Sequence, residues 1–241
     1  MSSAVLNQTP AFSFIQRLHK SPAKAEHRVR QLCCYTASTP GRHAVEAYIA
    51  DAFREQYDAH IEHFMPVLLT IETDHQIEAA LGLRFGDQRP LFLEHYLDQS
   101  VEAELAAHGL PNSAIVEVGN LVSTRAGCSQ LLFILLAELL DSLGCDTGVF
   151  TATTHVQQLL CKAGCELTTL CDADGNRLGP QLSQWGSYYE TAPRVVAYRV
   201  APAAQSVRER PVLARTFKHH RDDLARVIDM LAPGTSFAAQ A

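Results

Sequence analysis

The longest apolar run of the chain lies in residues 131–137, and it is the feature that most constrains the fold. Glu138 ends this run, and the two leucines that follow are stopped by Asp141. The run is therefore well short of the roughly 20 residues that a membrane-spanning helix needs. Its leucines recur at helical spacing up to Gly144, which indicates the most apolar helix of the chain. We expect a globular protein without a transmembrane span.

Strand patterns and helical patterns both occur along the chain, which predicts an α/β (α+β) fold. Strands are predicted for residues 29–35, 67–71, 78–85, 114–118, 147–152 and 194–200. Helices are predicted for residues 42–57, 99–108, 124–144, 155–162 and 217–231. Asp98 and Thr124 are the expected N-caps of the second and third of these helices. The polar turn at residues 72–75 is expected to join its flanking strands into a hairpin.

The chain of 241 residues is long enough for one large domain or for one domain with an appendage. Residues 1–27 are mixed polar and predict an irregular lead-in, so the main domain is expected at residues 28–203. Residues 201–205 are rich in Ala and Pro and predict a linker. Residues 204–241 are therefore expected to form a C-terminal linker and helix.

Composition and charge exclude several classes of protein. Apolar residues make up 47% and charged residues 19%, which is typical of a globular protein. The net charge of -6 provides no general attraction for nucleic acid or anionic lipid. The N-terminal residues lack the pattern of a secretion signal, which predicts a cytoplasmic protein. The seven cysteines are an odd number and are expected to be reduced, small buried side chains.

The order of elements from Arg42 onward resembles the Gcn5-related N-acetyltransferase fold. Residues 153–165 (TTHVQQLLCKAGC) are similar to the stretch after that fold's fifth strand, where a short helix ends in Lys-x-Gly-aromatic. Cys165 stands here in place of the aromatic residue. The resemblance implies a mixed, mostly antiparallel central sheet flanked by helices.

A second resemblance, over residues 42–200, is to the thermostable hemolysin family of bacterial proteins. The blocks on which it depends are residues 64–68 (FMPVL), 80–84 (ALGLR), 90–98 (PLFLEHYLD) with Glu102, 116–121 (VEVGNL) and 185–189 (WGSYY). The family name describes lysis of red cells, whereas the fold resembles that of acyltransferases and of acyl-homoserine-lactone synthases.

The resemblance implies a gap between two central strands as the site of the acyl donor. Strands that end at Asn120 and Thr151 are expected to part and to hold a pantetheine arm between them. The implied donor is acyl-CoA or an acyl carrier protein, and the basic stretch around Arg208, Arg210 and Arg215 is a candidate contact for the latter. The residues expected to bind the donor are Leu121, Val122, Ser123, Arg125, Gly127 and Thr151. In this loop the spacing of the phosphate-binding turn is altered and its second glycine is missing.

Glu117 is the expected general base, because it lies on a central strand where an unpaired carboxylate is costly. The alternative is that Glu117 is a buried partner of Arg84 or Arg125. Asn120 is expected either to fix the substrate or to form a plain turn at the end of the strand.

Tyrosines near the end of the main domain are the expected acid. Tyr188 and Tyr189 lie where acetyltransferases commonly keep a tyrosine that protonates the leaving thiolate, and a packing role is the alternative. The residues expected to contact the substrate are Arg84, Glu94, Tyr96 and Trp185. For Trp185 packing is the alternative, and for Glu94 it is capping and solvation of a helix.

Two other kinds of site were weighed and not favoured. His155, Cys161, Cys165 and Cys171 contain no Cys-x-x-Cys pair, so no metal site is predicted. A cysteine nucleophile needs an adjacent base, and Cys128 at a helix start is the one candidate.

The sequence therefore predicts an acyltransferase that moves an acyl group, fatty rather than acetyl, from a thioester to an amino group of a small metabolite. Lysis would then be due to an amphiphilic product. The alternatives are a membrane-damaging protein, which needs an exposed amphipathic surface such as the helix at residues 217–231, and a non-catalytic binding module.

Overall fold

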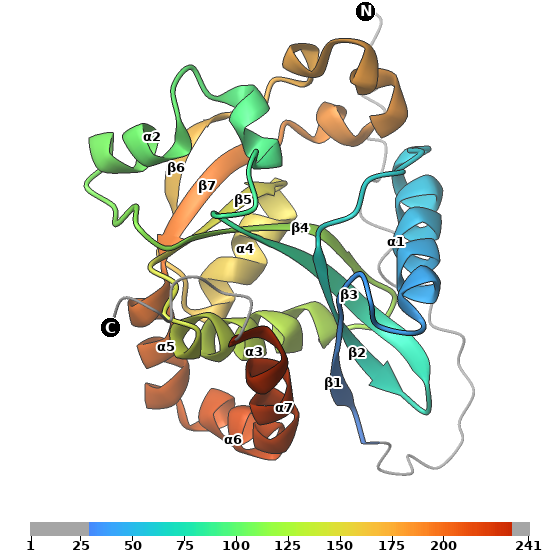
Figure 1. The fold of residues 1–241 in the computed structure, drawn as a ribbon, viewed down its shortest axis with the longest axis vertical. Helices are drawn as coiled ribbons and strands as arrows, with labels where there is room; N and C mark the ends of the chain where they lie inside the picture. Colours follow the sequence, from blue (N-terminus) through green and yellow to red (C-terminus); the bar gives the residue numbers. More distant parts are fainter. Residues whose placement is uncertain (1–28, 233–241) are drawn as a thin grey trace, which may run out of the picture.

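A seven-stranded sheet forms the centre of the computed structural model, which describes residues 29–232 (Figure 1). Its strand order is β1-β2-β3-β4-β5-β7-β6. Neighbouring strands are antiparallel except β4 and β5, which are parallel. The predicted mixed, mostly antiparallel sheet with flanking helices is therefore confirmed. The expected lead-in at residues 1–27 lies outside the described residues.

The strands of the sheet correspond closely to the predicted ones, with one addition. They are β1 (Gln31–Tyr35), β2 (Val67–Thr73), β3 (Gln76–Phe85), β4 (Ile115–Ser123), β5 (Thr147–Ala152), β6 (Thr168–Asp172) and β7 (Arg194–Arg199). Strand β6 was not predicted. It is an edge strand that is only partly buried, so its sequence lacks a strong apolar pattern.

Helices cover both faces of the sheet. They are α1 (Arg42–Tyr57), α2 (Val101–Ala107), α3 (Cys128–Ser142), α4 (Thr154–Ala163), α5 (Val200–Glu209), α6 (Pro211–His219) and α7 (Arg221–Leu231). Three short 3-10 segments are η2 (Phe92–Tyr96), η3 (Gly175–Trp185) and η4 (Tyr188–Thr191).

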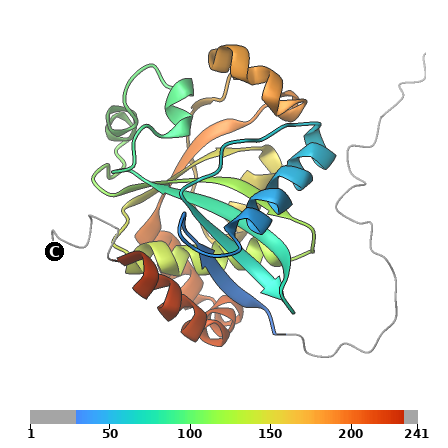
Figure 2. The same cartoon turned by 45° about the vertical axis from the view of Figure 1, so that its right-hand side comes forward.

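The two faces of the sheet have separate hydrophobic cores. On one face α3 is buried beneath the sheet, and α4 to α7 surround it. On the other face α1 contributes a stripe of Val45, Ile49 and Phe53, four residues apart. Segments η2, α2 and η3 cover the rest of that face. Figures 1 and 2 show α1 across the sheet from α3.

Two predicted N-caps are wrong. Helix α2 begins after Ser100, whose hydroxyl accepts from the Ala103 amide, whereas the side chain of Asp98 pairs with Arg177. Helix α3 begins after Gly127 instead of Thr124. The Thr124 amide still donates to the Glu78 carbonyl, because β4 is longer than predicted.

The predicted linker at residues 201–205 is also wrong, since these residues lie inside α5. Pro202 falls in the first turn, where a helix tolerates proline, and the alanines favour helix. The single helix predicted at residues 217–231 is instead parts of α6 and α7, which meet at the non-helical His220. The turn at His220 lets α7 pack Leu224 and Val227 into the core around α3.

Candidate active site

Strands β4 and β5 part near the middle of the sheet. Their pairing runs from Ile115 opposite Thr147 to Val118 opposite Phe150 and then ends. Beyond this point β4 remains paired with β3, but its register shifts between Ala80 and Gly82 of β3. This irregularity is a bulge that bends β4. The described strands therefore contain the gap that the resemblance implies.

Asn120 lies in the bulge and has a left-handed backbone with φ of 50°. Asparagine tolerates this conformation better than most residues. Its Oδ1 accepts a hydrogen bond of 2.9 Å from the Met65 amide, which fixes the chain that enters β2. The contacts of Asn120 thus shape the end of the strand.

Two glycines allow the Met65 side chain to lie close to the bulge. A Cβ at Gly82 would lie 2.5 Å from the Met65 Cβ, and one at Gly119 would lie 2.7 Å from its Cε. Both distances are shorter than a real contact allows. Packing around Met65 therefore requires Gly82, which faces the fixed Cβ, whereas the mobile methyl end of Met65 faces Gly119.

A pocket opens at the gap on the α1 face of the sheet, and we call it the β4–β5 pocket. Its walls come from residues 117–121 of β4, Phe150 and Thr151 of β5, α1, residues 60–65, and segments η2, η3 and η4. Its enclosed volume is about 140 Å³. This is close to the ~150 Å³ of an engineered cavity that binds benzene, so the cavity as it stands holds only part of a larger ligand.

Glu117 is buried at 2% exposure and lines this pocket. Its two carboxylate oxygens accept 2.8 Å hydrogen bonds from the Phe92 and Leu93 amides at the start of η2. Burial raises the pKa of Glu117, against the opposing effects of these two amides and of the nearby Arg84. The side chain therefore both anchors η2 and holds its proton more tightly than an ordinary glutamate.

Arg84 lies directly opposite Glu117 in the β3–β4 register and also lines the pocket. Its guanidinium donates to the Pro90 carbonyl at 2.7 Å and makes no ion pair within residues 29–232. The other alternative partner, Arg125, pairs with Glu78 instead of Glu117. Of the two arginines, only Arg84 is thus a neighbour of Glu117.

Aromatic rings form the wall opposite the gap. Tyr188 is buried, and its hydroxyl donates to the Thr151 carbonyl at 3.2 Å. The hydroxyls of Tyr189 and Tyr96 hydrogen-bond each other, and Trp185 packs against Tyr188 and Tyr189. Burial raises the pKa of Tyr189 to about 12 and raises that of Tyr188 as well. Both phenols are therefore protonated at neutral pH.

The Thr151 hydroxyl is buried at the same gap without a hydrogen-bond partner among the described residues. Thr151 follows the last residue of β5 that pairs with β4. A buried polar group without a partner is costly and calls for an explanation. An ordered water could supply that partner, as could a ligand if the hydroxyl turned toward the β4–β5 pocket.

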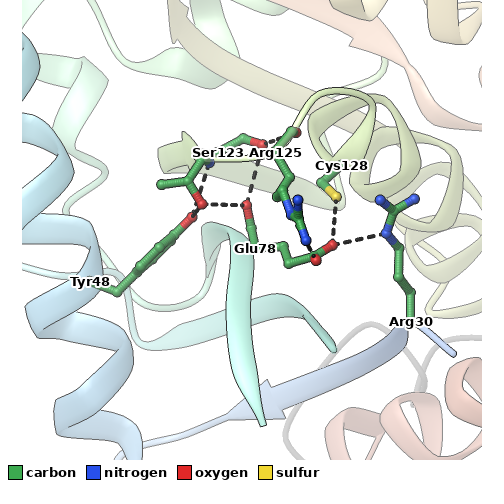
Figure 3. A network of polar contacts seen from close by, with 7 residues as sticks. Arg30, Tyr48, Glu78, Ser123, Arg125 and Cys128 are labelled. Atoms are coloured by element: carbon green, nitrogen blue, oxygen red, sulfur yellow. Dashed lines mark hydrogen bonds and ion pairs between the residues drawn. The ribbon is translucent and has the colours of Figure 1, made fainter. Parts of the chain in front are cut away.

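The predicted phosphate-binding loop is tied to a buried carboxylate, as Figure 3 shows. Of the loop residues, Leu121 reaches the pocket, and Val122 is buried against α1. The Ser123 hydroxyl donates to the Arg125 carbonyl, and Arg125 pairs with Glu78 at 3.2 Å. The structure thus places only Leu121 and Thr151 of the expected donor-binding residues at the pocket, with Gly127 as the cap of α3.

Glu78 is the centre of this loop cluster. It also pairs with Arg30 at 2.9 Å and accepts from the Cys128 thiol at 3.3 Å (Figure 3). Burial and the adjacent Glu78 raise the pKa of the Cys128 thiol to about 11. Since the thiolate is the nucleophilic form, Cys128 is a poor candidate for a nucleophile.

Some predicted residues lie outside the pocket. Glu94 caps η2 through the Leu91 amide and pairs with Arg89, so its contacts are those of the capping alternative. Tyr96 and Trp185 do line the pocket. In the basic stretch, Arg208 is held by Glu138 and Asp141 of α3.

Sequence reasoning missed the wall formed by α1 and residues 60–65. Phe53 and Tyr57 of α1 line the pocket, as do His60 and Phe64. Phe53 also belongs to the buried stripe of α1, and nothing in the spacing of apolar residues distinguishes a core aromatic from a pocket aromatic. The FMPVL block was the available signal, because its first two residues line the pocket.

Within residues 29–232, no group of three or more His, Cys, Asp or Glu side chains is arranged to hold a metal ion. Among the helices in this part of the chain, none combines the length and apolarity needed to cross a bilayer.

Comparison with solved structures identifies the fold. TofI in an apo form matches with a TM-score of 0.53 and 14% identity, over 76% of this chain and 99% of that chain. FeeM, an N-acyl amino acid synthase from uncultured soil microbes, matches with a TM-score of 0.52 and 12% identity, over 72% of this chain and 93% of that chain. The structure of BjaI, a CoA-dependent acyl-homoserine lactone synthase, with SAM and isopentyl-CoA matches with a TM-score of 0.50 and 14% identity. The match covers 84% of this chain and 100% of that chain. The chain has the acetyltransferase-like fold of these proteins.

Comparison with curated proteins finds no match. The family described as thermostable hemolysin matches residues 35–204, well over half of the chain. The blocks that line or support the β4–β5 pocket, FMPVL, ALGLR, VEVGNL and WGSYY, all lie within this range. The protein therefore belongs to the thermostable hemolysin family.

Proposed function

We propose that this protein is an N-acyltransferase that moves an acyl group from a thioester of CoA or of an acyl carrier protein to the amino group of a small metabolite. The observation on which the proposal depends is the parting of β4 and β5 beside the buried Glu117. The acyl-transfer functions of FeeM and BjaI, which share the fold, support it.

The reaction forms a C–N bond and breaks a C–S bond. The neutral amine attacks the thioester carbonyl, and the nitrogen then loses one proton while the thiolate gains one. Glu117 is the proposed base, acting directly or through water, because it lines the pocket and its pKa is raised. Tyr188 and Tyr189 are the proposed acids, since their phenols stay protonated at the pocket wall.

The donor is proposed to enter along the gap between β4 and β5. The pantetheine arm would lie beside residues 119–121, with the Thr151 hydroxyl as one contact. Asn120 would hold the bulge that keeps the strands apart. Ser123, Arg125 and Gly127 would face the polar end of the donor at the start of α3.

A fatty acyl donor is favoured over acetyl. Nine aromatic side chains line the pocket, including Phe64, Phe92 and Phe150, so much of its wall is apolar. An acylated amine with a long chain is an amphiphile, and such a product would account for lysis of red cells without a lytic protein.

A thiol-release assay tests the proposal. The protein is incubated with a mixed pool of amines and with acyl-CoA donors from acetyl to hexadecanoyl, or with the same acyl groups on an acyl carrier protein. We expect release of free thiol with the longer donors and a loss of about 10²- to 10⁴-fold in Glu117→Gln, which removes the base.

The matched control is Glu55→Gln, which changes an exposed carboxylate of α1 that does not line the pocket. This variant is expected to release thiol at the wild-type rate. Silence with every donor of both kinds would refute the acyltransferase proposal, and full activity of Glu117→Gln would refute the role of Glu117.

A further inference from the structure

Arg84 is the feature of the β4–β5 pocket that the proposed reaction leaves unused. It is half-buried, and it is the only arginine or lysine among the described residues that line the pocket. The histidines of the lining, His60 and His63, are exposed. Arg84 is therefore the fixed positive charge of the site.

No ion pair within residues 29–232 neutralises the charge of Arg84. Its attraction to Glu117 acts without direct contact, and its one hydrogen-bond acceptor is the Pro90 carbonyl. Other arginines near the pocket are committed: Arg89 pairs with Glu94, Arg125 with Glu78, and Arg177 with Asp98. A guanidinium has five N–H donors, so most donors of Arg84 are available to a ligand.

Glu117 does not take the place of that ligand in this structure. Although it lies opposite Arg84 in register, no ion pair joins the two side chains. Each Glu117 oxygen accepts one amide hydrogen bond, from Phe92 or Leu93, and keeps a second acceptor site for a proton. An unpaired charge at the edge of an apolar, aromatic pocket is unfavourable until an anion reaches it. A planar carboxylate matches the fork of a guanidinium.

We propose that the acceptor amine carries a carboxylate next to its amino group, as an α-amino acid does. The proposal rests on the acyltransferase function above and names the acceptor class. Arg84 binds the carboxylate, and the amino group then lies toward Glu117 and the gap. Directly opposed residues of antiparallel strands have Cβ atoms about 4.5–5.5 Å apart, so one small molecule spans the pair.

With the amino acid held in this way, the bonds and protons of the acyl transfer balance. The amino acid enters with a protonated amine and an ionised carboxylate. Glu117 takes one proton, the freed lone pair attacks the thioester carbonyl, and the C–S bond breaks. The second proton leaves the nitrogen as the amide forms and protonates the thiolate, directly or through Tyr188. The product is an N-acyl amino acid whose carboxylate still faces Arg84.

Paired acceptors test the proposal. Each of the common amino acids is compared with its α-carboxamide, which keeps the amine and the side chain but removes the negative charge. With the preferred acyl donor, we expect kcat/KM to favour the amino acid over its amide by about 10- to 100-fold, as a charge-assisted hydrogen bond implies.

Variants of Arg84 test whether this residue causes the preference for the amino acid over its amide. In Arg84→Gln we expect the ratio of kcat/KM for the amino acid to kcat/KM for its amide to fall to near one, because KM for the amino acid rises. Arg84→Lys should keep part of the preference for the amino acid, because lysine retains the positive charge but cannot bind a carboxylate through two parallel N–H donors. The matched control is Arg54→Gln on the exposed side of α1, which is expected to keep the full ratio.

The outcomes separate this inference from the proposed function. Thiol release with amides and simple amines as efficient as with amino acids would refute the inference and leave the acyltransferase standing. If no acceptor supports release, calorimetric titration with N-octanoylglycine and N-octanoylglycinamide decides the matter. Tighter binding of the acid, lost in Arg84→Gln, supports the inference, and equal or absent binding of the two overturns it.

Discussion

At the scale of the residue, the buried carboxylate of Glu117 has two tasks. Its oxygens hold the start of η2 through the Phe92 and Leu93 amides, and the same side chain lines the pocket. Burial outweighs these two hydrogen bonds, so the pKa is raised. A carboxyl group with a raised pKa is a stronger base when ionised, and it is a cost to the fold when charged.

The pH dependence of stability measures that cost. Because the folded state raises the pKa of Glu117, it binds the proton more tightly than the unfolded chain, and this contribution to stability is fully present below the unfolded pKa. It is lost as pH rises through the raised pKa. We expect the free energy of unfolding of the wild type, relative to Glu117→Gln, to fall as pH rises above the usual glutamate range.

Urea denaturation of both proteins at a series of pH values between 4 and 8 provides the measurement, with thiol release recorded in parallel. Activity should rise with pH over the same interval in which the relative stability falls, since both report ionisation of one group. A difference in stability that is constant with pH would contradict the raised pKa.

At the scale of the element, α5, α6 and α7 all pack against α3. Glu138 of α3 is buried at 3% exposure and pairs with Arg208 of α5 at 2.9 Å. The other oxygen of Glu138 has no partner among the described residues. Arg208 also pairs with Asp141, so one guanidinium compensates two carboxylates of α3.

Removal of Arg208 should therefore destabilise the protein. In Arg208→Ala the buried carboxylate of Glu138 loses its cation, and we expect the free energy of unfolding to fall by about 1–3 kcal/mol. The exposed control, Arg215→Ala on α6, should change it little. In Arg208→Ala/Glu138→Leu the buried charge is absent, so part of the loss should be recovered. Equal urea midpoints for Arg208→Ala and the wild type would contradict this account.

At the scale of the whole molecule, α7 turns its apolar side inward. Its residues Leu224, Val227 and Leu231, in the segment expected to supply an amphipathic surface, are buried in the core around α3. The proposed function assigns lysis to an amphiphilic product instead of to this segment.

Leakage from dye-loaded liposomes tests that view. Protein alone should cause no leakage above that of a protein control. Protein with a long-chain acyl donor and an amine should cause leakage that grows with time, because the amphiphilic product accumulates. Rapid leakage by protein alone at low dose would support the membrane-damaging alternative instead.

The sequence predicted the sheet, its flanking helices and the gap well, because apolar periodicity and family blocks are local signals. Most of the site residues predicted from the sequence do line the pocket: Arg84, Tyr96, Glu117, Thr151, Trp185, Tyr188 and Tyr189. It did not predict the wall of residues 60–65, nor that Arg125 would pair with Glu78. Such contacts depend on which distant segments meet, and spacing along the chain does not encode that.

The niche around Met65 has an evolutionary consequence. Gly82 has no room for even a methyl group beside the Met65 Cβ, and Asn120 holds the same residue by its amide. A change at one of these positions, which are far apart in the chain, would strain the other two unless they change with it. Related sequences that keep methionine at position 65 are therefore expected to keep Gly82 and Asn120, and with them the bend in β4.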